Sequence, residues 1–97
     1  MSALKRIRKA LRERRVELSD HALEEMDNDN LTLSDVRLVL AGGSIHATQE
    51  DDPRGPRYVV RDQIDGEDVD VVCRFLASGI LLVITVFIVK EADEDNE

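Results

Sequence analysis

The chain has few of the features that define other classes of small protein. One cysteine among 97 residues allows no internal disulfide, which fits a reducing cytoplasm. Its longest apolar run, residues 80–89, has ten residues, whereas a membrane-spanning helix needs about 20. No apolar stretch follows the charged N-terminus, so the pattern of a secretory signal is missing. We therefore expect one cytoplasmic domain with no membrane contact.

Signatures of metal and cofactor sites are also missing. Cys73, His21 and His46 do not have the spacing of a zinc site, and the acidic runs 50–52 and 93–95 do not match a calcium loop. The chain has no phosphate loop, nucleophile elbow or dinucleotide motif. We expect neither a metal nor a cofactor.

Charge is divided unevenly along the chain. The first 16 residues hold seven lysines and arginines and one glutamate, whereas the whole chain carries a net charge of −8. Such a basic amphipathic helix can dock on the acidic body or recruit an acidic partner. Residues 1–90 should form one α+β domain, and the acidic residues 91–97 a disordered tail.

Hydrophobic periodicity predicts helices followed by strands. The N-terminal helices should pack on one face of a four-stranded antiparallel sheet. The expected helices are 3–15, 21–26 and 33–41, with 16–18 as an extended link, and the expected strands are 44–49, 57–64, 67–76 and 80–89.

The dipeptide Asp65-Gly66 predicts a two-residue hairpin and therefore a register. Arg61 then lies opposite Asp70, and Arg57 opposite Arg74. The three arginines share a face, which we take as the best candidate for binding RNA or another anion, since guanidinium groups hold phosphate in bidentate fashion. The alternative is that they pair with Asp68, Asp70 or the acidic loop.

In the last strand we expect Leu82, Ile84, Val86 and Ile88 in the core. Leu81, Val83 and Phe87 would then form an apolar patch beside the arginines. Such a patch indicates a protein partner, a second copy of the chain or a ligand groove, unless the first helix covers it. His21, early in the second helix, is either a general base, a pH sensor or a structural residue.

Several short segments occur in an order that resembles a known family. They are Ser19-Asp20-His21-Ala22 with Met26, Leu33-Ser34-Asp35-Val36, Ala41-Gly42-Gly43, Arg57-Tyr58-Val59-Val60, Val71-Val72-Cys73-Arg74 and Ile84-Thr85-Val86-Phe87. This order resembles an uncharacterised family of small prokaryotic proteins, a domain of unknown function, that is similar to BrnT-type toxins and more distantly to the RelE/ParE superfamily. The resemblance covers about residues 18–87.

The resemblance implies a RelE/BrnT-like α+β fold and RNA as a target. By position, Arg61 and Arg74 would bind phosphate and His21 would be the family histidine, so these three are the candidate catalytic residues. Phe87 stands where many relatives have a tyrosine.

Two functions follow. The first is a non-catalytic module that binds an antitoxin-like protein or forms a homodimer. The alternative is an RNA-directed toxin, a ribonuclease that uses the arginine cluster.

Overall fold

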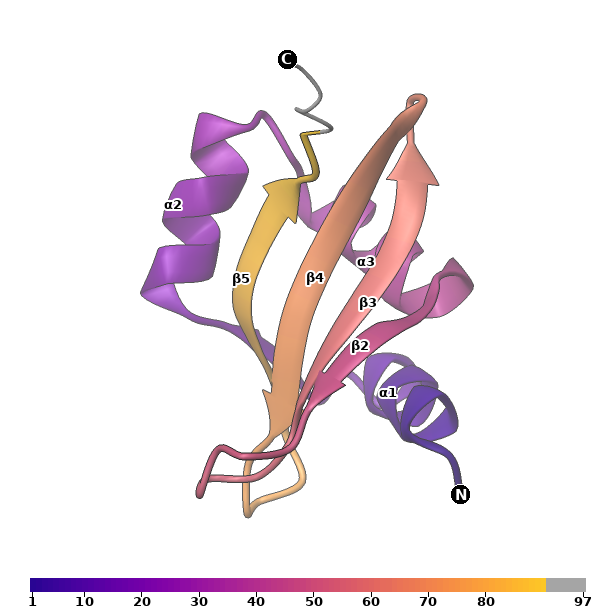
Figure 1. Ribbon diagram of the computed structural model, residues 1–97, viewed down its shortest axis with the longest axis vertical. Coiled ribbons are helices and arrows are strands. Elements are labelled where there is room, and N and C mark those ends of the chain that lie inside the picture. The colour runs from indigo at the N-terminus through magenta and orange to yellow at the C-terminus, as the bar shows by residue number, and fades with distance from the viewer. Residues whose placement is uncertain (91–97) are drawn as a thin grey trace.

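The computed structural model describes residues 1–90, so the expected acidic tail 91–97 lies outside the described residues (Figure 1). These residues form three helices and five strands, and all three helices come before the second strand. In chain order they are α1 (Ala3–Arg12), β1 (Val16–Leu18), α2 (Asp20–Asn28), α3 (Leu33–Gly42), β2 (Ser44–Gln49), β3 (Arg57–Ile64), β4 (Glu67–Phe75) and β5 (Leu81–Ile88).

The strands form one mixed sheet in the order β1-β5-β4-β3-β2. The α+β class is confirmed, but the prediction of four antiparallel strands is wrong. Residues Val16–Leu18, expected as a link, form a fifth strand that runs parallel to β5. The other three strand pairs are antiparallel.

Each helix begins at a side-chain cap. Ser2, Ser19 and Thr32 each accept a backbone hydrogen bond, and Thr32 forms a reciprocal capping box with Asp35. The first helix ends at Arg12 rather than at Arg15. There Arg14 adopts φ 59°, and the N–H groups of residues 14 and 15 donate to carbonyls of the last turn, which closes the helix without a glycine.

The predicted register of β3 and β4 is confirmed. Tyr58 lies opposite Cys73, Arg61 opposite Asp70 and Ile64 opposite Glu67. Alternate residues of these strands therefore point to opposite faces of the sheet. On the helix-covered face the core holds Tyr58, Val60, Val69, Val71 and Cys73.

The predicted orientation of β5 is half wrong. Between the pairs Val72–Thr85 and Cys73–Val83 the register shifts, so Ile84 is an extra residue that forms a β-bulge. Leu81 and Val83 are consequently 0% exposed and belong to the core. The expectation that they line an open interface is wrong. Val86, beyond the bulge, is in the core as predicted, whereas Leu82 lies beside Arg74.

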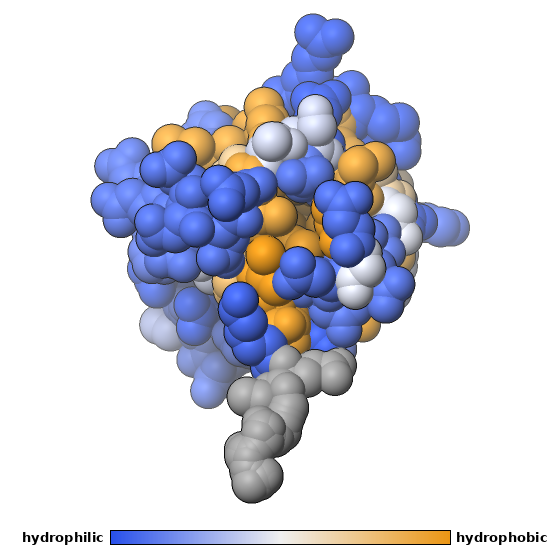
Figure 2. Space-filling model, turned by 90° about the horizontal axis from the view of Figure 1, so that it is seen from above, coloured by the Kyte–Doolittle hydropathy of each residue, from blue (hydrophilic) through white to orange (hydrophobic). Residues whose placement is uncertain are grey.

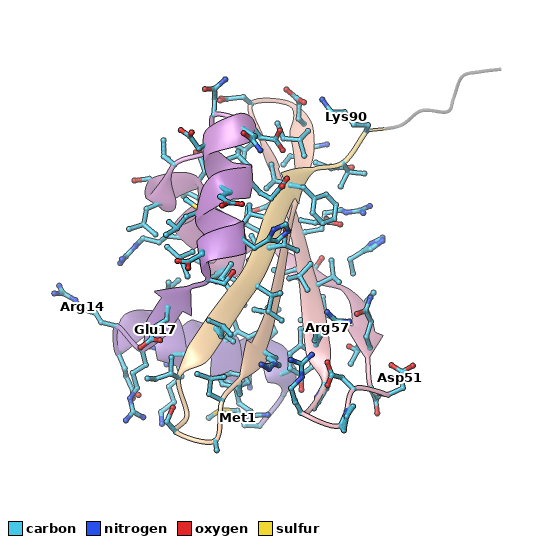
Figure 3. The ribbon with its side chains drawn as sticks, turned by 90° about the vertical axis from the view of Figure 1, so that its left-hand side faces the viewer. Met1, Arg14, Glu17, Asp51, Arg57 and Lys90 are labelled. Carbon is cyan, nitrogen blue, oxygen red and sulfur yellow. The ribbon has the colours of Figure 1, made fainter. Side chains whose placement is uncertain are left out.

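All three helices lie on one side of the sheet or at its β5 edge (Figures 1 and 3). In α1, Ile7 and Ala10 are buried in the core, and the Arg6 guanidinium lies 4.2 Å from the centre of the Phe75 ring. Thus α1 is a structural element of the domain and does not cover the other face. Figure 2, viewed from the end where β5 leaves the sheet, shows apolar residues between hydrophilic surfaces.

Candidate functional site

The face of the sheet opposite the helices carries the predicted arginines. Figure 3 shows Arg57 on this side and Arg14 on the other. We call this surface, formed by Arg57, Val59, Arg61, Asp70, Val72, Arg74 and Phe87, the open face. Although no described helix lies over it, Val59 and Val72 are only 7% and 8% exposed, so neighbouring side chains shield the centre of this face.

Arg61 is engaged by a carboxylate in the middle of the open face. Its Nε and Nη2 donate to the two oxygens of Asp70, at 2.6 and 3.0 Å. Asp70 is 4% exposed, so this bidentate pair is sheltered from solvent. The alternative that the arginines pair with neighbouring carboxylates therefore holds for Arg61, whose ion-pair partner is Asp70.

Arg57 lies near the acidic loop between β2 and β3. Its Nε lies 3.8 Å from Oδ2 of Asp52, a long ion pair with the acidic loop, as the alternative predicted, but too long for a hydrogen bond. Asp52 is bound instead by Arg54, through Nε and Nη2 at 3.2 Å and through the backbone N–H at 2.9 Å. These hydrogen bonds, first that of the Arg54 side chain, lower the pKa of Asp52 to about 2.

Arg74 lies next to Leu82, one step along β4 from the Tyr58–Cys73 pair. Continuing the antiparallel register places it opposite Arg57. In the described part of the chain, the buried Nε atoms of Arg57 and Arg74 have no hydrogen-bond partner. A buried donor without an acceptor is unfavourable, and two like charges on facing positions add to this. An anion placed between the two guanidinium groups would offset both effects.

His21 lies on a different element from the arginines. It is exposed in the first turn of α2, next to the N-cap Ser19. The Ser19 hydroxyl accepts from the Ala22 N–H at 3.0 Å and donates to the Ile84 carbonyl at 2.7 Å. The serine of this motif thus fastens α2 to the bulge of β5, a role that the sequence did not reveal because the bulge itself was not predicted.

Phe87 lies opposite Asp70 on β5 and is partly exposed, so it keeps its predicted place on the open face. Cys73 is buried on the other face, and burial raises the pKa of its thiol to about 12. Among residues 1–90, no group of three or more His, Cys, Asp or Glu side chains could hold a metal ion. No helix in the same range is long and apolar enough to cross a membrane.

Comparison with protein families identifies residues 18–88 as a domain of unknown function, DUF4258. The chain belongs to this family. The expected membership in an uncharacterised domain family is thereby confirmed, whereas the relation to BrnT or RelE is not. Comparisons with curated proteins and with solved structures gave no match.

Proposed function

We propose that this DUF4258 chain is a non-catalytic binding module whose open face binds an acidic segment of a protein partner. The observation that carries the proposal is the pair of buried, unsatisfied Nε–H donors on Arg57 and Arg74. A carboxylate placed between the two guanidinium groups would accept these hydrogen bonds and offset the repulsion between them. Phe87 would supply an apolar contact on the same surface.

Charge favours a carboxylate partner over RNA. Outside its first 16 residues the chain is strongly acidic, and such a body repels a polyphosphate over its whole length. A short acidic peptide segment meets this repulsion at fewer positions.

Geometry also gives little support to catalysis. Arg61 is bound by Asp70, and His21 is exposed on α2, on a different element from the arginines. General base catalysis requires the base within hydrogen-bond reach of the reacting group.

The second candidate is an RNA-directed toxin, as the family resemblance implies. What supports it is that the same Arg57 and Arg74 donors suit a phosphate as well as a carboxylate. In that case Arg74 would hold the backbone of the RNA, and His21 would be the proton-transfer group.

The experiment compares labelled hexaglutamate with a single-stranded RNA oligonucleotide, using fluorescence anisotropy and a cleavage gel. Loss of one charge-assisted hydrogen bond in Arg74→Gln should weaken hexaglutamate binding about tenfold. Arg12→Gln, on the exposed side of α1, should leave it unchanged. Equal weakening by both variants would place the peptide on the basic helix and refute the proposal.

RNA cleavage by the wild-type chain that is lost in Arg74→Gln would establish the toxin instead. Sedimentation of the wild-type chain tests whether the partner is a second copy of the same chain. A dimer that Arg74→Gln and Phe87→Ser both dissociate would make the partner a second copy of the chain.

A further inference from the structure

An apolar groove lies on the helix side of the sheet, between α1, β1 and α3. Its walls are Leu11, Val16, Leu18, Leu33, Val36 and Leu40, and its volume is about 280 Å³. This volume is slightly below that of the smallest small-molecule pockets, about 300 Å³. The groove is therefore large enough for one or two apolar side chains. It lies across the sheet from the open face and is independent of the proposed function.

The apolar surface continues from the groove along α3. A second depression shares Leu11 and Arg37 with it and includes Leu38. Leu33 is 50% exposed and Leu38 57%, two of the four large apolar side chains that the described residues expose most. Two such leucines on one helix, beside a groove, mark a surface that a partner can cover.

One wall of the groove is the free edge of the sheet. In the described part of the chain, β1 pairs only with β5. The Arg15 carbonyl and the Ser19 N–H are bonded to β5, at 2.8 and 3.0 Å. Because alternate residues of a strand bond to the same neighbour, the backbone groups of Val16 and Leu18 point away from β5. They can pair with an added strand.

Two arginine side chains contribute positive charge to the groove. Arg14 and Arg37 both line it and are exposed, and Arg14 belongs to the basic first 16 residues. Neither guanidinium has a carboxylate partner among the ion pairs of residues 1–90. The charge at this surface is thus complementary to an acidic chain.

We infer that the groove binds an extended acidic segment of a protein partner, which adds as a strand beside β1. One or two apolar side chains of the segment enter the groove, and its carboxylates pair with Arg14 and Arg37. Backbone hydrogen bonds to Val16 and Leu18 supply affinity that does not depend on sequence, while the apolar pocket and the arginines supply specificity. The chain's own residues 91–97 are acidic but contain no large apolar side chain, so they lack the group that the groove would take.

The test uses the full chain and a labelled peptide, Glu-Glu-Leu-Ser-Leu-Glu-Glu, with a counterpart in which lysine replaces each glutamate. Fluorescence anisotropy should detect the acidic peptide and not the lysine peptide. Arg37→Glu replaces an attraction by a repulsion and should weaken binding at least about tenfold. Lys5→Glu, an exposed charge reversal on α1 outside the groove, is the matched control.

A second pair of variants tests the apolar contact. Leu33→Ser removes a wall of the groove, whereas Leu23→Ser removes an equally exposed leucine, 49% against 50%, from α2. The first should weaken binding about tenfold and the second should not. Similar losses in both variants, or equal binding of the acidic and lysine peptides, would overturn the inference.

Hydrogen exchange distinguishes strand addition from other modes of docking. On binding of the acidic peptide, the amides of Val16 and Leu18 should become protected, whereas that of Ser19, already bonded to β5, should change little. Binding that leaves the amides of Val16 and Leu18 both unprotected would refute an added strand. Displacement of the peptide by an RNA oligonucleotide would assign the surface to nucleic acid.

Discussion

The guanidinium group of Arg61 and the carboxylate of Asp70 form a bidentate ion pair across β3 and β4, with donor–acceptor distances of 2.6 and 3.0 Å. The pair occupies the middle of the open face, in the row that also contains Phe87. It distinguishes Arg61, which is bound by Asp70, from Arg57 and Arg74, whose buried Nε–H groups have no hydrogen-bond acceptor among residues 1–90.

Removing Asp70 should destabilise the domain strongly. Asp70→Ala would leave a partly buried guanidinium without this carboxylate, and we expect a loss of about 3 kcal/mol in the free energy of unfolding. Urea denaturation measures this quantity. In Arg61→Leu/Asp70→Leu, apolar contacts should restore most of the loss. Asp68→Ala, on the same face and in none of the ion pairs of residues 1–90, is the control. A loss of under about 1 kcal/mol in Asp70→Ala would mean that the pair is worth no more than a surface one.

Ser19 should matter more than the other serine cap. Ser19→Ala removes both the cap of α2 and the hydrogen bond to Ile84, so we expect a loss of about 2 kcal/mol. Ser2→Ala removes only an exposed bond to the Lys5 N–H, of 3.2 Å, and should cost about 0.5 kcal/mol. Thermal or urea unfolding compares the two. Equal effects would contradict the tie between α2 and the bulge.

Cys73 should be inert in the folded protein. Its pKa of about 12 leaves almost no thiolate at pH 8, and its side chain is 0% exposed. A thiol reagent such as dithionitrobenzoate should therefore react only as the chain unfolds, and the rate should rise with urea in step with the loss of structure. Rapid labelling without denaturant would contradict the position of Cys73 in the core.

The loop that precedes β3 should respond to acid. The folded pKa of Asp52, about 2, lies below the value of about 3.9 for an unfolded aspartate. The interactions of Asp52 thus stabilise the fold at pH values above about 4 and are lost as the pH falls through about 2. A carboxyl-carbon NMR titration measures this pKa.

Because Arg54 is the main cause, Arg54→Ala should return the pKa of Asp52 towards 3.8. Arg57→Ala should change it less, since the Nε of that guanidinium is 3.8 Å from Asp52, too far for a hydrogen bond to it. A larger shift in Arg57→Ala than in Arg54→Ala would contradict the assigned cause.

The sequence predicted the central hairpin because its signal is local. Asp65-Gly66 fixes the turn, and alternation of valine with arginine and aspartate fixes which side chains face the core. The same alternation predicted that Arg61 and Asp70 share a face and are neighbours.

Where alternation is missing, the prediction was wrong. Both faces of β5 are apolar, so no pattern shows the extra residue Ile84 or the change of face before it. Strand β1 has three residues and pairs with a partner more than 60 positions away, so no local signal marks it. The orphaned donors of Arg57 and Arg74 depend on packing, which composition does not reveal.

The attachment of α2 to β5 at both of its ends affects how readily the protein can aggregate through its sheet edge. Ser19 bonds to Ile84 and Asp29 to the N–H of Ile88, so the helix occupies the flank of β5 beyond β1. An apolar strand left bare along its length invites cross-β stacking between molecules. Among residues 1–90, the strand β1 beside β5 on that flank has only three residues, so it offers few backbone groups for pairing with strands of other molecules.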